Sequence, residues 1–535
     1  MRMQMRNRIL VVATLLNLGL ACSDANDGSH DATGGKSNQG TGGRAASGGE
    51  THDGGDAGQA SSPGGKSSGG KSSGGSAGVS GAPDDAGGDG SGEVAGAGGA
   101  GGTDSSLGGA GPGPGVQAAR FFLPTGEPDN TAAPSVEVDA KGGIHTVYPA
   151  YAGGNAYYAY CGANCSAQSE VKVVMFETQG TVANAMLALT ADGRPRVLLS
   201  TFQKVYFGSC ESNCSAQASW TLNEILDHGS DREISGEALA LDPEGHPRFL
   251  MHTYRAYLGI GQKPPKTFYA TCESDCGQAA SWTYSEIAQE IWEGTSLRFD
   301  ATGRAHVATV VNFNEGDRAG TKLSAYMECD GACTSADDWN GIGFVAPYES
   351  DIEAVSVRPT VSLALTHTGA PRVAVLGKTD AGGKNIIYFE CDSDCTNDHW
   401  QGSVVSNHDQ IDAGLDLALD AQDHPRFVYT LNYNIGLAYC DQESCAGPDS
   451  SWDLTKVELG GEIPPDEIFL WENCTIGAWF LHSPSIALTS DGKPRVGYQA
   501  RDISGGFSQP DPSKPGCTAG TDMTWSRLAV LSSYK

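Results

Sequence analysis

The sequence predicts an all-β protein whose main domain is a seven-bladed β-propeller of four-stranded blades, and two repeated patterns support this prediction. A short hairpin recurs seven times. Its common form is Leu-Ala-Leu, then a turn, then Pro-Arg and an apolar residue, as in Leu239–Phe249 and Ile486–Val496, and two repeats have histidine in place of the arginine. A closely spaced pair of cysteines follows the hairpin in six of the seven repeats. Repeats of this kind are typical of propellers, in which each repeat forms one blade.

Each repeat contains signals for four strands in a constant order. The first strand alternates large and small apolar residues, as at Leu187-Ala188-Leu189, and this period of two is typical of a strand buried on both faces. A turn follows, centred on glycine in six repeats and on Asp423 in the other. The second strand begins at Pro-Arg, and the third is aromatic and ends at the cysteine pair. The fourth begins near a tryptophan: Trp220, Trp282, Trp339, Trp400, Trp452 and Trp525.

The segment Arg120–Leu123 precedes the first repeat, where a fourth strand would precede any other repeat. We expect it to pair with the last repeat beside Ser526–Leu531, which would close the ring and remove a free sheet edge. This count leaves one strand surplus, and the sequence does not identify the segment that stays out of the ring.

The hairpin, an apolar strand followed by Asp-x-x-Gly and a second apolar strand, resembles the repeats of NHL-type bacterial β-propellers. The resemblance covers most of residues 133–530. It implies the fold but no particular activity, because such propellers include enzymes, binding proteins and scaffolds. The Cys-x-x-x-Cys element is not part of the common NHL pattern.

Two segments precede the propeller domain, which we assign to residues 117–535. Residues 1–21 resemble the signal peptide of a bacterial lipoprotein, with Cys22 as the lipidated residue; an ordinary signal peptide with an incidental cysteine is the alternative. Residues 22–116 are mostly Gly, Ser, Ala and Asp, so we expect a disordered linker. We therefore expect a protein anchored in the cell envelope, at the outer membrane or cell surface, through the lipid on Cys22 alone.

The chain has 15 cysteines, and 14 remain when Cys22 is set aside. Twelve of these 14 cysteines form six local pairs, so by elimination Cys474 and Cys517 are left to pair at long range. An exported protein meets an oxidising environment, so we expect disulfides rather than zinc sites, which need four ligands brought together. The six local pairs are Cys161/Cys165, Cys210/Cys214, Cys272/Cys276, Cys329/Cys333, Cys391/Cys395 and Cys440/Cys445.

No metal or other cofactor is expected. The loops closed by the cysteine pairs are acidic, and calcium is the alternative to simple solvated turns. These loops lack the Asp-x-Asp-x-Asp-Gly spacing of a dedicated calcium site. The acidic residues are Glu211, Glu273, Asp330, Asp392 and Asp394.

One position at the start of the second strand carries a basic or imidazole side chain in every repeat. A residue that recurs in nearly every blade is usually structural, so we expect these side chains to pair with acidic turns of adjacent blades. A basic ring that binds an anion is the alternative. The residues are Arg196, Arg248, Arg372, Arg426 and Arg495, with His145 and His306 in the other two repeats.

The function expected from the sequence is a non-catalytic binding module for a carbohydrate or a protein, and we expect a monomer. The net charge of −30 at pH 7 argues against nucleic acid as a partner. No nucleophile elbow, P-loop, His-Glu-x-x-His zinc site or sialidase-type Ser-x-Asp-x-Gly-x-x-Trp turn occurs, so no catalytic residue is assigned. Two alternatives remain: an extracellular propeller enzyme acting on glycans or lactones, and a passive envelope spacer.

The ligand surface is expected on the face built by the longer, irregular loops, because loops on a rigid scaffold often carry function. The segment with Trp471, Trp479 and Phe480 is richest in aromatic residues, and we expect these rings to stack on the ligand; the alternative is that they are buried within their own insertion. Glu137 and Arg298 stand in first strands where other repeats have alanine, and they are candidates to face the central channel. An enzyme would gather carboxylates or histidines with shifted pKa values at the channel mouth.

Overall fold

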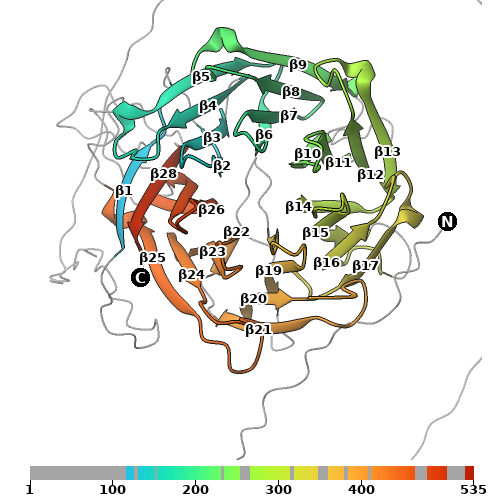
Figure 1. Cartoon of the computed structure of the whole chain (residues 1–535), viewed down its shortest axis with the longest axis vertical. Helices are drawn as coiled ribbons and strands as arrows, with labels where there is room; N and C mark the ends of the chain where they lie inside the picture. The colour runs from blue at the N-terminus through green and yellow to red at the C-terminus, as the bar shows by residue number, and fades with distance from the viewer. Residues whose placement is uncertain are drawn as a thin grey trace, which may run out of the picture. The chain divides into compact units, whose positions relative to one another are not determined.

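The computed structural model describes residues 116–125, 131–150, 154–229, 234–253, 266–313, 318–347, 360–378, 383–407, 411–463, 479–502 and 524–535. These residues form seven four-stranded antiparallel sheets in a ring, which confirms the predicted seven-bladed propeller (Figure 1). Residues 1–21, Cys22 and nearly all of the linker expected before residue 117 lie outside the described residues. No described segment forms a helix long and apolar enough to cross a membrane.

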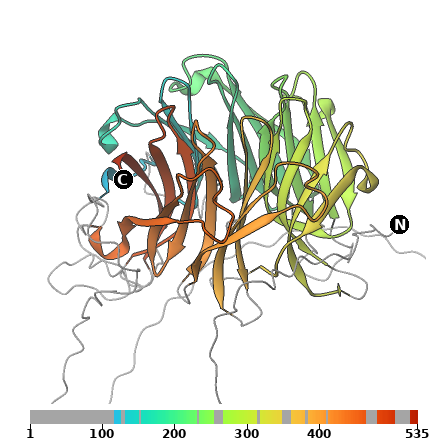
Figure 2. The same ribbon diagram turned by 60° about the horizontal axis from the view of Figure 1, so that its bottom comes forward.

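The strands of six blades follow one another in sequence from the channel outward, and blade 7 takes its outer strand from β1; Figure 2 shows the same blades from a tilted view. Blade 1 comprises β2 (Ser135–Val138), β3 (Ile144–Pro149), β4 (Asn155–Cys161) and β5 (Lys172–Glu177). Blade 2 comprises β6 (Val182–Leu189), β7 (Pro195–Thr201), β8 (Lys204–Cys210) and β9 (Trp220–Asp227). Blade 3 comprises β10 (Ile234–Leu241), β11 (Pro247–Thr253), β12 (Lys266–Cys272) and β13 (Trp282–Ala288). Blade 4 comprises β14 (Ile291–Phe299), β15 (Ala305–Asn312), β16 (Lys322–Cys329) and β17 (Trp339–Gly343).

The last three blades complete the ring. Blade 5 comprises β18 (Val361–Leu365), β19 (Pro371–Lys378), β20 (Lys384–Glu390) and β21 (Gln401–Asn407). Blade 6 comprises β22 (Ile411–Leu419), β23 (Pro425–Leu431), β24 (Asn434–Tyr439) and β25 (Asp453–Leu459). Blade 7 comprises β26 (Trp479–Leu488), β27 (Pro494–Asp502), β28 (Thr524–Ser533) and β1 (Gln117–Phe122). Short 3₁₀ helices occur at η1 (Gln168–Glu170), η2 (Gln217–Ser219), η4 (Ala279–Ser281), η6 (Ala336–Asp338) and η7 (Gly460–Glu462).

The ring closes as the sequence predicted. Strand β1 lies antiparallel beside β28 in blade 7, with Phe121 opposite Leu528 and Arg120 opposite Ala529 (Figure 1). The expected surplus strand does not exist among the described residues, because β1 supplies the outer strand of blade 7. Trp525 accordingly lies in the third strand of its blade and does not begin a fourth.

A tryptophan at or next to the start of the outer strand packs on the preceding blade in five cases. Its ring meets an aromatic residue of that blade's third strand, and packing of this kind adds an edge-to-face or tilted aromatic contact to the buried apolar area. The ring centroids are 4.7 Å apart for Trp220 and Tyr158, 5.5 Å for Trp282 and Phe207, 5.6 Å for Trp339 and Tyr269, 4.9 Å for Trp400 and Tyr326, and 5.1 Å for Trp452 and Tyr388.

The six local disulfides are present, which confirms the predicted pairing of neighbouring cysteines. Each bond closes the loop between the third and fourth strands of its blade. The bonds join Cys161 to Cys165, Cys210 to Cys214, Cys272 to Cys276, Cys329 to Cys333, Cys391 to Cys395, and Cys440 to Cys445. Cys474 and Cys517, which we expected to pair at long range, lie outside the described residues.

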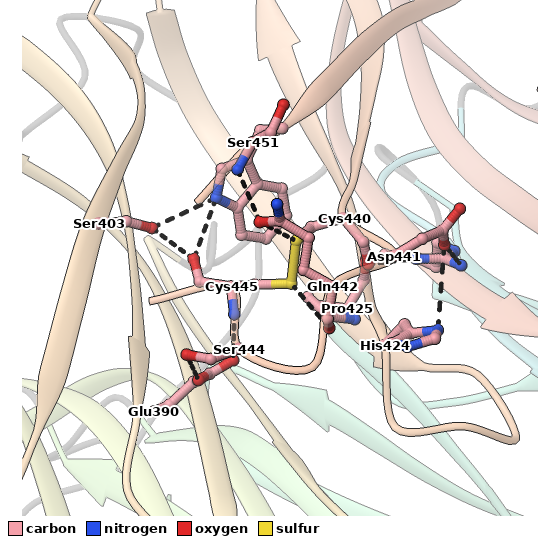
Figure 3. The surroundings of a disulfide bond; sticks show 12 residues. Glu390, Ser403, His424, Pro425, Cys440, Asp441, Gln442, Ser444, Cys445 and Ser451 are labelled. Atoms are coloured by element: carbon pink, nitrogen blue, oxygen red, sulfur yellow. Dashed lines mark hydrogen bonds and ion pairs between the residues drawn. A yellow bond between two sulfur atoms is a disulfide. The ribbon is translucent and has the colours of Figure 1, made fainter. Parts of the chain in front are cut away.

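Four of the disulfide loops also hold the tryptophan of the outer strand. The indole Nε1 donates to the carbonyl oxygen of the second cysteine, as from Trp220 to Cys214 at 2.7 Å and from Trp282 to Cys276 at 2.8 Å. The tryptophans of blades 5 and 6 make the same bond to their own loops. Figure 3 shows the loop of blade 6, in which the N–H of Cys445 donates to the Glu390 carboxylate of blade 5 at 3.0 Å.

The loops are less alike than their uniform cysteine spacing indicated. Cys214 and Cys276 are half-buried, whereas the second cysteines of the other four loops are buried. In blade 4, Cys333 itself has a left-handed backbone with a φ of 57°, but in blades 2, 3 and 5 the residue before the second cysteine takes this conformation. The indole Nε1 of Trp339 makes no hydrogen bond to any described residue. The blade 4 loop therefore holds its tryptophan by packing and not by this hydrogen bond.

The arginines of the second strand are structural, but their partners differ from those we expected. The carboxylates that these guanidinium groups bind belong to their own blade, and Arg426 also donates to the Tyr534 hydroxyl of blade 7 at 2.9 Å. Arg248, for example, donates to the carbonyl oxygen of Cys272 at 2.8 Å and to the Glu273 carboxylate at 2.8 Å. Arg196 and Arg372 repeat this arrangement with Glu211 and Asp392. The arginine thus fastens the cysteine loop to the second strand.

A buried ion pair joins blade 6 to the blade that closes the ring. Arg527 on β28 donates to both carboxylate oxygens of Glu458 on β25, at 2.6 and 2.7 Å. The Tyr498 hydroxyl donates to the same carboxylate, and the Arg527 guanidinium lies 4.5 Å from the centre of the Phe122 ring of β1. Glu458 is 4% exposed and Arg527 is 2% exposed, so this pair is shielded from solvent.

We predict that replacing Trp400 by alanine lowers the free energy of unfolding by about 3–5 kcal/mol, because the buried ring is lost at a contact between blades. Replacing Val404 by alanine is the matched control, because this side chain is 55% exposed on the adjoining β21. Urea denaturation measures both variants. A Trp400→Ala variant as stable as the control would contradict a stabilising role for the tryptophan.

We predict that Glu458→Ala costs about 3–5 kcal/mol of stability, because the buried Arg527 charge then loses its carboxylate. The solvent-exposed pair of Lys204 and Glu224, at 2.9 Å, provides the comparison, and Glu224→Ala should cost less than about 1 kcal/mol. Chemical denaturation of both variants at pH 7 measures the difference. Equal losses would show that burial does not strengthen the pair at the ring closure.

Candidate active site in the central channel

The first strands of the seven blades place equivalent residues at one level of the central channel. These residues are equivalent because, in every blade, the residue of the first strand is paired with the arginine or histidine of the second strand. Five blades have alanine here, whereas Glu137 stands opposite His145 and Arg298 opposite His306. We name this level the charged layer; its members are Glu137, Ala188, Ala240, Arg298, Ala364, Ala418 and Ala487.

Glu137 and Arg298 line two cavities in the channel. The first cavity, of about 390 Å³, opens among the glycine turns, and we name it the turn-face pocket. Its wall includes the turn residues Asp139 and Thr190 and the apolar Phe299. The second, of about 130 Å³, lies toward the opposite end of the inner strands, and we name it the inner cavity. The short alanines of blades 2 and 3 leave the space into which the two charged side chains project.

Hydrogen bonds between neighbouring inner strands hold the channel wall in place. The side chains that form these hydrogen bonds lie two residues before the charged layer in the sequence. They are therefore on the same face of each strand as the charged layer. The Ser485 hydroxyl accepts from the N–H of Val136 at 3.2 Å. Asp416 occupies this position in blade 6 and accepts from the N–H of Ile486 at 2.9 Å and from the Ser362 hydroxyl at 2.8 Å.

The environment of Glu137 favours its protonated form. Burial raises the pKa of Glu137 from 4.5 to about 7, and the positive charge of Arg298 opposes this rise while the negative charge of Asp416 adds to it. The carboxyl group makes no hydrogen bond to any described residue, so no donor stabilises its ionised form. A carboxyl group that titrates near neutral pH in a cavity is suited to transfer protons.

The other carboxylates of the channel have structural partners. Burial raises the pKa of Asp416, against hydrogen bonds from Ile486 and Ser362 and the charge of Arg298. Burial also disfavours ionised Asp139, but hydrogen bonds from Gly143, His145 and Lys141 outweigh it and lower the pKa of this carboxyl. An Asp or Thr recurs at the Asp139 position in every blade to cap the turn. Glu137 is therefore the carboxyl group that no structural role explains.

Two of the three aromatic residues that we expected to stack on a ligand are buried, as in the alternative considered from the sequence. Trp479 and Phe480 are 2% and 1% exposed, because they begin β26 and pack into blade 7. Trp471 lies outside the described residues. Glu137 and Arg298, which we noted only as exceptions to the alanine pattern, do face the channel. Asp416 was missed, although comparison of the repeats would have revealed an acid where most have serine or another small residue.

The acidic clusters of the turn face already contain a positive charge. Asp242, Glu244 and His246 approach one another closely enough to hold a metal ion, as do Asp420, His424 and Asp441. In both clusters, however, an arginine of the second strand binds the first aspartate, at 2.6 Å from Arg248 and at 2.7 Å from Arg426. These guanidinium groups neutralise the carboxylates that a cation would need.

Comparison with known proteins assigns this chain to no family. No protein-family model matches the chain, and no curated protein matches it. Among solved structures, a polysaccharide lyase described as an ulvan lyase has 12% identity and a TM-score of 0.40, over 62% of this chain and 79% of its own. An α-L-arabinofuranosidase from Fusarium graminearum has 9% identity and a TM-score of 0.40, over 66% and 99%. A Hadza microbial sialidase has 9% identity and a TM-score of 0.40, over 75% and 66%.

The expectation of a non-catalytic binding module, and of a protein that is not an enzyme, is wrong. The propellers named above are enzymes that act on glycans, although at these TM-scores the likeness shows the fold alone. Within this chain, the channel carries the feature that we expected of an enzyme, a carboxyl group with a shifted pKa beside further charged groups.

We predict that Glu137→Gln stabilises the protein at pH 8 and changes its stability little at pH 4. Because the folded state raises the pKa of Glu137 from 4.5 to about 7, stability falls as the pH rises through this interval. Removing the ionisable group should recover up to about 3 kcal/mol above pH 7. Thermal or urea denaturation at both pH values measures this gain. The exposed Glu244→Gln serves as control, and an equal effect at pH 4 and pH 8 would contradict the assignment.

Proposed function

We propose that this protein is an enzyme that cleaves glycosidic bonds in an extracellular polysaccharide, with Glu137 as the proton donor. The observation that carries the proposal is the place of Glu137 in the wall of a 390 Å³ pocket, where burial raises the pKa of its carboxyl group to about 7. Pockets of this size accommodate small ligands, and sugar units bind in pockets that combine polar and apolar walls. The turn-face pocket has both kinds of wall, with Thr190 and Asp139 beside Leu189 and Phe299.

The chemistry of the pocket favours glycans over lactones. Cleavage of a glycosidic bond requires a proton for the departing oxygen, and a carboxylic acid with a raised pKa supplies it. Lactone hydrolysis requires an activated nucleophile or a metal-bound water. Thr190, the one hydroxyl residue in the described wall of this pocket, accepts from the N–H of Arg194 at 2.9 Å and caps its turn.

An extracellular site of action is part of the proposal. Six disulfides in one domain are typical of proteins that fold in an oxidising compartment. We propose that residues 1–21 direct export, that Cys22 carries the anchoring lipid, and that the Gly/Ser-rich linker lets the domain reach polysaccharides at some distance from the membrane. A monomer would suffice, because the turn-face pocket is lined by blades 1 to 4 of one chain.

The test is cleavage of a panel of polysaccharides by the full chain, followed by release of reducing ends. We predict that Glu137→Gln lowers kcat/KM by about 10²- to 10⁴-fold, because the proton donor is lost while the shape is kept. Activity of the unmodified protein should fall as the pH rises above about 7, where Glu137 loses its proton. Ultraviolet absorbance of an unsaturated product separates elimination from hydrolysis.

The matched control is Glu244→Gln, which removes an acid from an exposed turn of the same face. It should keep full activity. If Glu137→Gln retained full activity on every polysaccharide that the unmodified protein cleaves, the assignment of Glu137 would be refuted. If the unmodified protein cleaved none of them, the proposed function itself would fail.

A further inference from the structure

Arg298 is the basic counterpart of Glu137 in the charged layer. Its charge acts on Glu137 and Asp416, but it forms no salt bridge with a carboxylate of the described residues. Its only described hydrogen bond runs from Nη1 to the carbonyl oxygen of Leu297 at 2.9 Å. The side chain is partly buried and lines both cavities of the channel. Its remaining N–H groups are therefore available to a molecule that enters the turn-face pocket.

Four of the five second-strand arginines bind a carboxylate, and the fifth, Arg495, binds the carbonyl oxygens of Pro494 and Leu531. Arg196, Arg248 and Arg372 each hold a carboxylate at 2.8 Å. Arg298 is held only by the carbonyl oxygen of its own neighbour, although withdrawal of a charge from water is costly without a partner of opposite charge. Unlike the buried Arg495, Arg298 lines the turn-face pocket, so a ligand in this pocket can supply the anionic partner.

We propose that the turn-face pocket binds a sugar that carries an anionic group, and that Arg298 binds this group. The inference rests on the proposed function and names its substrate class. A guanidinium matches the two oxygens of a carboxylate or a sulfate ester with two parallel hydrogen bonds. The walls contributed by blades 2 and 3 are uncharged, so Arg298 is the group of the described pocket that can attract an anion.

Binding of the anion at Arg298 would also affect Glu137. The charges that act on Glu137 are those of Arg298 on β14, which favours its ionised form, and Asp416 on β22, which disfavours it. Asp139 and His145 lie on the same blade, and Asp139 shares the pocket wall. A bound anion would neutralise Arg298 and so hold the proton on Glu137. Substrate binding thereby prepares the proton donor.

The experiment measures binding of three oligosaccharides of equal length by calorimetry: one with a uronic acid, one with a sulfate ester and no uronic acid, and one neutral. The full-length Glu137→Gln variant is used so that no ligand is cleaved. We expect at least one acidic oligosaccharide to bind tenfold or more tightly than the neutral one. Arg298→Ala in the same background should abolish this preference, and the two acidic ligands show whether the carboxylate or the sulfate is recognised.

Arg298→Ala is expected to fold, because five blades carry alanine in the charged layer. Arg304→Ala is the matched control, since Arg304 also lies in blade 4 but binds Glu328 and Asp330 outside this pocket. It should keep the preference for the acidic ligand. In the unmodified protein the affinity for a ligand that is not cleaved should weaken above neutral pH, and in Glu137→Gln it should not.

The outcomes separate this inference from the proposed function. Equal affinity for acidic and neutral oligosaccharides, or a preference that survives Arg298→Ala, would overturn the inference. Cleavage of neutral polysaccharides that depends on Glu137 and not on Arg298 would do the same, while the proposed function would stand. Binding of an acidic oligosaccharide through Arg298 without cleavage of any polysaccharide would support the inference and refute the proposed function.

Discussion

The contact between an outer-strand tryptophan and the third strand of the preceding blade fixes the geometry on which the ring depends. A four-stranded sheet has no reason to stop at a given angle to its neighbour unless a side chain of defined shape lies between them. The indole ring meets an aromatic ring of the previous blade, and in four blades its N–H is bound to a carbonyl oxygen of a disulfide-closed loop. The short disulfide loops thus act on the spacing of whole blades, not only on their own turns.

The channel shows how a functional site arises on a repetitive scaffold. Residues that recur from blade to blade have structural partners: Asp or Thr side chains of the turns cap backbone N–H groups, and four second-strand arginines hold cysteine loops. Glu137 and Arg298 depart from the repeat and lack such partners among the described residues. An ionisable group that raises the energy of the folded state near neutral pH is retained where function requires it, and this trade between stability and activity is common at active sites.

Most of the architecture could be predicted from the sequence, because its signals are local and repeated. The alternation at Leu187-Ala188-Leu189, the cysteine spacing and the apolar segment beginning at Arg120 each predicted a feature that is present. The site was harder to predict. A strand pattern gives two faces but does not show which end of the channel is hollow. The ligand surface was expected among the long loops, whereas the candidate pocket opens among the turns. Burial of Trp479 and Phe480 likewise depends on where β26 begins, which no local signal marked.

The alanines of blades 2 and 3 have a consequence for how such a protein diversifies. Ala188 and Ala240 lie in the wall between Glu137 and Arg298, and each has a methyl group where a longer side chain would enter the cavity. The backbone at these positions already tolerates a glutamate and an arginine in sister repeats. A single substitution at either position would therefore place a new side chain at a different position around the channel axis. No loop would have to change and no blade would be lost. Related chains could in this way acquire different selectivities while their ring remained the same.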